Sequence, residues 1–193
     1  MSDSQRWAYV VASAAPPILR ISEFIAELQK SQWQVCLIVT PTAATWIDLD
    51  EISSATGCVT RATPRGPRER DALPLADALV VAPMTFNTLN KWAAGISDTL
   101  ALGVLNEMLG IDIPITAAPC IKSALRQHPA YNDSTRRLTE CGVNVMNPEL
   151  ITTRDEDGLA TFEWPLVLKE ISTDRTCGVN TKRRTEGLCL DSG

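Results

Sequence analysis

The chain of 193 residues has the length of one ordinary domain with its own core, and its 45% apolar and 21% charged residues are typical of soluble globular proteins. A net charge of −5 and a pI near 4.9 argue against nucleic acid as a main partner, because phosphate binding needs a basic face. No apolar run reaches the roughly 18 residues of a membrane span, and the opening MSDSQRW lacks the order of a signal peptide. We therefore expect a cytoplasmic protein without a membrane partner.

Cysteine usage argues against a metal site. The six cysteines are Cys36, Cys58, Cys120, Cys141, Cys177 and Cys189. None forms a C-x-x-C pair, and only one histidine is available as a further ligand. We expect no metal, and thiols that are packed or free.

Apolar runs of strand length alternate with helical patterns in the first third of the chain. Residues 7–13 and 34–40 predict buried strands, and 59–62 predict a weaker one. Residues 16–31 carry apolar side chains at helical spacing, with two prolines at the start where a missing N–H is tolerated. A short helical stretch follows the second strand and ends near Gly57.

The middle of the chain repeats this alternation. Residues 63–74 are rich in proline and charge and predict a loop. Residues 76–84 and 113–120 predict strands, and a long helical pattern fills 88–109 between them, before Gly110.

The last third predicts two helical pieces in 121–141, broken near Pro129, and a final core strand at 143–149. Residues 151–164 read as a hairpin around DEDG, either a plain surface hairpin or a lid over a site. Residues 174–193 have little apolar patterning and predict a disordered tail.

Strands that alternate with helices indicate βαβ units and a parallel sheet covered on both faces. We predict a single α/β domain over residues 1–173, a three-layer αβα sandwich of Rossmann or flavodoxin type. In such folds ligands bind at the carboxyl ends of the strands, near a reversal in strand order.

Three of the predicted strand ends carry hydroxyl or amide side chains. These are Ser13 after the first strand, Thr40 and Thr42 after the second, and Thr85, Asn87 and Thr88 after the third. Because each precedes a helix, where backbone N–H groups are free, they could together hold a phosphate. The alternative is that each is an ordinary helix N-cap.

Common catalytic fingerprints are absent. The sequence contains no G-x-G-x-x-G, no P-loop and no G-x-S-x-G elbow. The single histidine, His128, precedes Pro129 at a helix break, where a surface or capping role is more frequent than a catalytic one.

The segment APMTFNT at 82–88 resembles the P-A-S-A-N-T motif of the homo-oligomeric flavin-containing cysteine decarboxylases. Gly95 and Asp98 match the family's following G-x-x-D element. ASAA at 12–15 and TPTAATWI at 40–47 resemble its first two strand ends, so the resemblance covers about residues 6–165.

This resemblance implies FMN as the cofactor, bound at subunit contacts of a homo-oligomer, a trimer or a dodecamer of trimers. Ser13, Ala14, Thr40 and Thr42 would approach the phosphate and ribityl chain, Pro83, Met84, Thr85, Asn87 and Thr88 would line the flavin, and Asp98 would support the site. Phe86 stands where the family has a small alanine, which makes this wall bulkier.

The chain departs from the family at the substrate and at the catalytic base. Pro119, Cys120, Ile121 and Lys122 occupy the start of the family's substrate motif P-x-M-N-x-x-M-W, so Lys122 replaces the carboxylate-binding asparagine. The family's catalytic histidine aligns near Glu69. The resemblance thus makes Glu69, Asn87 and Lys122 the candidate catalytic residues, and it places 151–164 at the family's substrate clamp.

The resemblance implies an FMN-dependent oxidative decarboxylase that converts the C-terminal cysteine of a peptide to an enethiol, in the biosynthesis of a ribosomal peptide natural product. The alternatives are a phosphopantothenoylcysteine decarboxylase, or a flavin-binding partner or regulatory protein without this activity. A flavin prenyltransferase would need a dimethylallyl phosphate site, for which no specific residue is evident.

Overall fold

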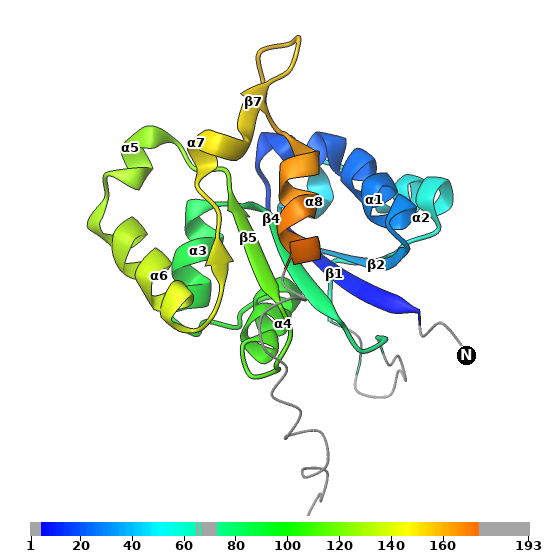
Figure 1. Cartoon of the computed structure of the whole chain (residues 1–193), viewed down its shortest axis with the longest axis horizontal. Coiled ribbons are helices and arrows are strands. Elements are labelled where there is room, and N and C mark those ends of the chain that lie inside the picture. The colour runs from blue at the N-terminus through cyan, green and yellow to red at the C-terminus, as the bar shows by residue number, and fades with distance from the viewer. Residues whose placement is uncertain (1–4, 65, 67–72, 174–193) are drawn as a thin grey trace, which may run out of the picture.

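A six-stranded parallel sheet forms the centre of the molecule in the computed structural model, which describes residues 5–64, 66 and 73–173 (Figure 1). The strand order is β3-β2-β1-β4-β5-β6. The strands are β1 (Arg6–Ala12), β2 (Trp33–Val39), β3 (Val59–Arg61), β4 (Ala78–Met84), β5 (Ile115–Pro119) and β6 (Asn144–Val145). The prediction of a parallel α/β sheet of Rossmann or flavodoxin type is therefore confirmed.

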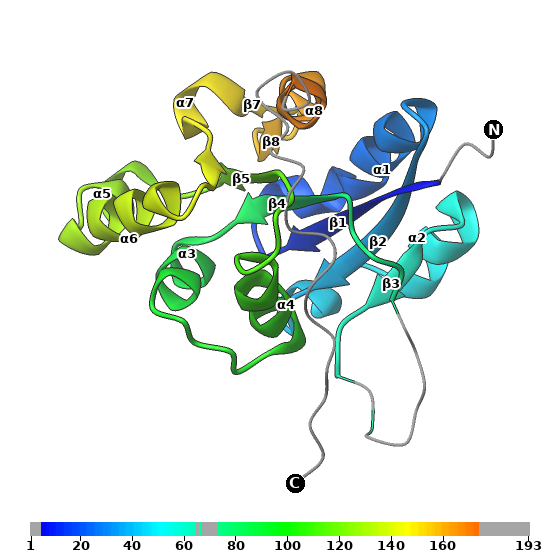
Figure 2. The ribbon, with the colours of Figure 1, turned by 60° about the horizontal axis from the view of Figure 1, so that its bottom comes forward.

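Helices cover both faces of the sheet. They are α1 (Ile21–Lys30), α2 (Leu49–Thr56), α3 (Phe86–Ala93), α4 (Leu100–Met108), α5 (Ser123–Arg126), α6 (Pro129–Glu140), α7 (Pro148–Ile151) and α8 (Trp164–Thr173), with 3₁₀ turns η1 (Pro16–Arg20) and η2 (Ala43–Thr45). Figure 2 shows α1 and α8 on one side of the sheet and α3 and α4 on the other. The predicted three layers are thus present.

The alternation of side chains along the central strands creates two separate cores. On β1, Val10 packs in the cluster that holds α1 and α8, whereas Val11 packs in the cluster that holds α3 and α4. Both are fully buried, because a parallel strand between two helical layers has no solvent face. The apolar runs that predict the strands follow from this double burial.

The predicted helix over 88–109 is wrong, because the chain forms two helices there. Helix α3 ends at Ala93, and Gly95 has a φ of 72°, a left-handed conformation that favours glycine. The hydroxyl of Thr99 then accepts a hydrogen bond from the N–H of Leu102 and caps α4. Apolar spacing continues through this interruption, and so the pattern alone does not show it.

The predicted last strand at 143–149 is also wrong in length. Only Asn144 and Val145 pair with β5. The Asn147 side chain then accepts a hydrogen bond from the N–H of Glu149 and caps α7, which has Pro148 at its first turn. The break near Pro129 in the helical region 121–141 is confirmed.

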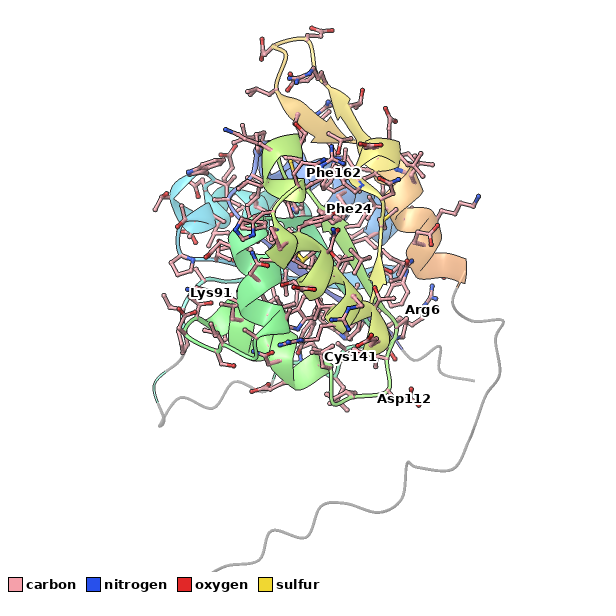
Figure 3. All side chains as sticks on the ribbon, turned by 90° about the vertical axis from the view of Figure 1, so that its left-hand side faces the viewer. Arg6, Phe24, Lys91, Asp112, Cys141 and Phe162 are labelled. Atoms are coloured by element: carbon pink, nitrogen blue, oxygen red, sulfur yellow. The ribbon has the colours of Figure 1, made fainter. Side chains whose placement is uncertain are left out.

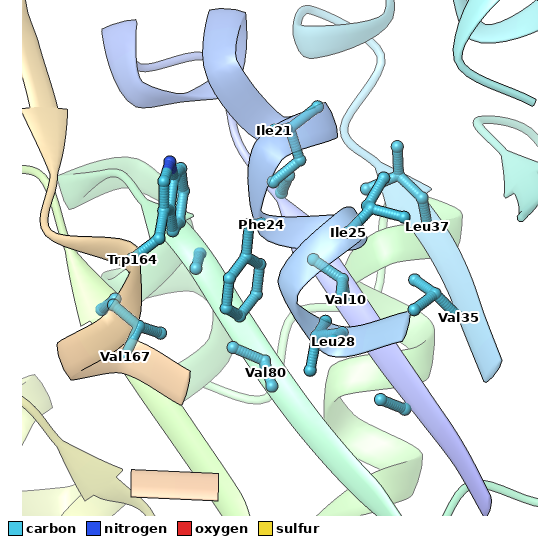
Figure 4. Close-up of a cluster of buried hydrophobic side chains, with 14 of the residues drawn as sticks. Val10, Ile21, Phe24, Ile25, Leu28, Val35, Leu37, Val80, Trp164 and Val167 are labelled. Carbon is cyan, nitrogen blue, oxygen red and sulfur yellow. The ribbon is translucent and has the colours of Figure 1, made fainter. Parts of the chain in front are cut away.

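Helix α8, which the sequence patterns did not indicate, is held by aromatic contacts. The Trp164 and Phe24 rings stack with centroids 4.8 Å apart, and Phe162 meets Trp164 edge-on at 5.3 Å. Figure 4 shows Trp164 and Val167 facing Phe24 beside Val80 of β4. Because Phe162 ends strand β8 (Ala160–Phe162), these contacts also fix the hairpin that β8 forms with β7 (Thr152–Arg154).

The described helices are short. In residues 5–64, 66 and 73–173, none is both long and apolar enough to cross a bilayer.

Trp92 of α3 belongs to the core, where its Nε1 donates a hydrogen bond to the carbonyl oxygen of Leu105 at 3.1 Å.

We predict that Trp164→Ala lowers the free energy of unfolding by about 3–5 kcal/mol, because it removes the ring that joins α8, α1 and the hairpin. Leu166→Ala on the same helix is the matched control, since Leu166 is 43% exposed. Urea denaturation followed by circular dichroism measures both. Equal losses in the two variants would contradict this account of α8.

Candidate functional site

A cleft of about 890 Å³ lies at the carboxyl ends of the central strands, beneath the hairpin formed by β7 and β8. Its lining comes from the segments that follow β1, β2, β4, β5 and β6 and from the hairpin. The lining residues are Ala14, Ala15, Pro16, Trp46, Thr85, Phe86, Asn87, Cys120, Ile121, Lys122, Leu125, Arg126, Pro148, Glu149, Thr152, Arg154, Gly158, Leu159 and Ala160.

The position of the cleft follows from the strand order. From β1 the chain continues to β2 on one side, and from β4 it continues to β5 on the other. The segments after β1 and β4 therefore diverge to opposite faces and leave a crevice between them. Ala14 and Pro16 line this crevice from one side, and Thr85 and Asn87 line it from the other.

Three predicted hydroxyl residues form one hydrogen-bonded chain beside the cleft. The Ser13 hydroxyl donates to Thr88 Oγ1 at 2.9 Å, and the Thr85 hydroxyl donates to the same oxygen at 3.1 Å. Thr85 Oγ1 in turn accepts from the N–H of Thr88 at 3.3 Å, as the N-cap of α3. Because Ser13 and Thr88 are buried, they fix the end of β1 to α3, and only Thr85 lines the cleft.

The other predicted cofactor residues fall into two groups. Thr40 Oγ1 lies 3.4 Å from the backbone nitrogen of Ala43, from which it accepts a hydrogen bond, and Thr42 is exposed. Neither lines the cleft, although Trp46 from the same connection does. The sequence reasoning missed Trp46, which is 45% exposed, a rare position for so large an apolar ring.

Pro83, Met84 and Asp98 do not line the cleft either. Pro83 and Met84 are buried in β4, below the cleft. Asp98 forms an ion pair with Lys91, beyond the C-terminal end of α3. Figure 3 shows Lys91 below Phe24 and Phe162 and away from the hairpin. The structure thus separates Asp98 from the other predicted cofactor residues of its own chain.

The predicted substrate segment forms the side of the cleft that follows β5. Cys120, Ile121 and Lys122 line it, and Pro119 is buried at the end of the strand. Burial raises the pKa of the Cys120 thiol. This thiol therefore stays protonated at neutral pH.

Four of the described charged residues line the cleft, and of these the sequence analysis singled out only Lys122. Lys122, Arg126 and Arg154 contribute three positive charges to the lining, and Glu149 contributes one negative charge. Arg126 Nη1 lies 3.0 Å from Glu149 Oε1. The cleft is therefore cationic in a chain whose net charge is −5. Only the fold brings together Arg126, Glu149 and Arg154.

His128 has the capping role that the sequence predicts. Its Nδ1 accepts a hydrogen bond from the N–H of Ala130 at 3.1 Å at the start of α6. Its ring also contacts the Phe86 ring edge-on, with centroids 5.7 Å apart, and so packs against a residue that lines the cleft.

Glu69 and the tail 174–193 lie outside the described residues. Among the described residues, no three His, Cys, Asp or Glu side chains gather as metal ligands.

A family model described as Flavoprotein matches residues 1–175. The chain belongs to the Flavoprotein family. Over 85 residues it is 34% identical to the coenzyme A biosynthesis bifunctional protein CoaBC of Thermococcus kodakarensis, a match that covers 44% of this chain. The match spans only 20% of that relative's length.

Solved structures of low sequence identity share the fold of this flavoprotein. A PPC decarboxylase mutant complexed with pantothenoylaminoethenethiol has a TM-score of 0.69 at 20% identity, and covers 87% of this chain and 97% of its own. The FMN-dependent cysteine decarboxylase SpaF has a TM-score of 0.67 at 19% identity, with 88% and 97% covered. An EpiD variant complexed with the substrate peptide DSYTC has a TM-score of 0.67 at 18% identity, with 86% and 98% covered.

We predict that iodoacetamide alkylates Cys120 more slowly than Cys141 at pH 8. Burial lowers the thiolate fraction of Cys120 by raising its pKa, whereas Cys141 is exposed. The alkylation rate at Cys120 should rise as the pH increases, because a larger fraction of the Cys120 thiol is then ionised. Peptide mass mapping at timed intervals measures each site. Equal rates at both cysteines would contradict the burial of Cys120.

Proposed function

We propose that this flavoprotein binds FMN in the cleft and oxidatively decarboxylates the C-terminal cysteine of a peptide to an enethiol. One observation carries the proposal. The segment that resembles the flavin-binding motif, 82–88, and the segment that aligns with the substrate motif, 119–126, follow two neighbouring strands and contribute residues to a single cleft. A cofactor and a substrate held by these two segments would touch each other.

The cleft fits FMN in its chemistry. Its size is within the range of about 300–1,000 Å³ that is usual for cofactor pockets. Phe86, Ile121 and Leu159 offer apolar surface for a flat aromatic ring system. The first turn of α3 leaves the N–H groups of Phe86 and Asn87 without helical acceptors, so they are available to flavin oxygen atoms.

Bound FMN would supply a two-electron acceptor for oxidation of the cysteine side chain. The protein residues would bind and orient the substrate beside it. Lys122 offers an ammonium group to the substrate carboxylate, and Asn87 offers an amide from the neighbouring segment after β4. The hairpin formed by β7 and β8 would exclude water from the cleft. Overall the substrate loses CO₂ and two hydrogen atoms.

A further catalytic residue and association of several copies of the chain are also part of the proposed function. Glu69 is proposed to act in place of the family histidine. Asp98 lies away from the cleft of its own chain, so a role in support of the flavin would have to be at the cleft of a second copy. We propose a homo-oligomer, a trimer or a dodecamer of trimers, acting in the cytoplasm.

Phosphopantothenoylcysteine is the second candidate substrate, because the CoaBC relative acts in coenzyme A biosynthesis. The peptide is favoured because the acidic hairpin over 151–164 contains no cysteine, whereas the substrate clamp of the coenzyme A pathway enzymes carries one. A parallel assay with both substrates separates the two functions, since each product has its own mass. If neither substrate reacts while FMN binds, the non-catalytic flavin-binding role takes precedence.

The first experiment is an absorption spectrum of the purified protein, followed by mass analysis of the released cofactor. We expect a flavin band and FMN. Incubation with peptides that end in cysteine should then yield products lighter by one formic acid unit. A colourless protein that does not take up added FMN would exclude the proposed function.

We further predict that Asn87→Ala lowers decarboxylation by about 10²-fold or more, because it removes a positioned amide from the cleft. Asn90→Ala is the matched control. Asn90 lies on the same helix but outside the cleft, and its Oδ1 accepts a hydrogen bond from Ser134. Single-turnover kinetics on FMN-loaded protein measures both. Equal activity in the two variants would contradict the role of Asn87.

A further inference from the structure

The guanidinium of Arg126 is incompletely paired at the wall of the cleft. Its Nη1 donates to Glu149 Oε1 at 3.0 Å. Its Nε is buried and has no hydrogen-bond partner among the described residues. A buried donor without an acceptor is costly, so the guanidinium keeps hydrogen-bonding capacity that Glu149 does not use.

The one carboxylate that pairs with Arg126 is held weakly. The side chain of Glu149 is 68% exposed, whereas that of Arg126 is 23% exposed. An ion pair with one partner mostly in solvent contributes little, because water competes for it. A carboxylate that arrives from the cleft can therefore share the guanidinium with Glu149 or replace it.

A second cation lies four residues earlier in the chain. Lys122 precedes α5, and the N–H of Arg126 donates to the Lys122 carbonyl oxygen at 3.1 Å, so the two residues are joined through one helical turn. Both side chains line the cleft. Within residues 5–64, 66 and 73–173, Lys122 forms no ion pair.

Helix α6 adds no carboxylate to the lining of the cleft. Tyr131 is the titratable group of that helix that senses both Arg126 and Glu149. Burial raises the pKa of Tyr131, so its phenol is neutral at neutral pH. Among the described residues that line the cleft, Glu149 is therefore the one carboxylate that balances this positive charge.

We propose that Arg126, together with Lys122, binds the terminal carboxylate of the substrate, and that Glu149 is an internal counter-ion which weakens binding of that carboxylate. The guanidinium fork presents two parallel donors to a carboxylate, whereas Lys122 adds a point charge. This inference rests on the proposed function and adds Arg126 and Glu149 to it as residues that determine specificity for a free carboxyl end.

The test compares two peptides that differ only at the C-terminus. Acetyl-Ala-Ala-Ser as the free acid and as the C-terminal amide are titrated into FMN-loaded protein by calorimetry, because serine in place of cysteine prevents turnover. We expect the acid to bind roughly tenfold or more tighter than the amide. Arg126→Met should remove most of this preference, because it weakens binding of the acid far more than binding of the amide.

Three further variants sharpen the result. Glu149→Gln should tighten binding of the acid several-fold, since it removes the competing carboxylate. Arg126→Lys should retain part of the preference. Arg136→Met is the matched control, because Arg136 pairs with Glu140 on the outer surface of α6 and lies outside the cleft.

The flavin band is recorded for every variant before titration. Absence of FMN binding counts against the proposed function, whereas the acid preference reports on the carboxylate site. A wild-type protein without any acid preference would overturn the inference. An Arg126→Met variant that keeps the full preference with its flavin bound would overturn it as well.

Discussion

The contact between the end of β1 and the start of α3 determines the shape of the cleft. The backbone N–H of Ser13 donates to the Pro83 carbonyl oxygen at 2.9 Å, and the Ser13 hydroxyl donates to Thr88. These two bonds hold together the segments at which the chain diverges to opposite faces of the sheet. Small side chains are required at this junction, because Ala14 and Thr85 must leave space between the walls. The polar residues after β4 therefore have a structural role as well as a proposed ligand-binding one.

Charge is distributed unevenly in this acidic chain. Three of the four charged residues that line the cleft are positive, although the whole chain carries −5. Apolar residues around the partly buried Arg126 lower the local dielectric constant and strengthen its attraction for an anion. The same apolar walls suit a planar cofactor, so the cleft combines the two properties that the proposed reaction requires of it.

Much of the fold could be predicted from the sequence, because the central strands are buried on both faces and read as continuous apolar runs. The break at Gly95 could not, since apolar spacing continues across it into α4. Helix α8 was not predicted, because it is stabilised by the packing of Trp164 on Phe24, a tertiary contact that the local sequence pattern does not show.

At the site, local motifs predict Thr85, Asn87 and Lys122, all of which line the cleft. Trp46 and Arg126 were missed because no local pattern marks them and only the fold brings them there. For Ser13 the sequence predicts the position but not the direction of the side chain. The sequence places it at a strand end, but whether its hydroxyl faces a ligand or the interior depends on its partner, Thr88.

The brevity of the two outer strands has a consequence for how copies of the chain can associate. Strand β3 has three residues and β6 has two, so each edge of the sheet offers another chain few unpaired backbone groups. Growth of the sheet by edge-to-edge strand pairing is thereby disfavoured. Any specific assembly must use helix and loop surfaces, whose side chains can be changed without disturbing the sheet.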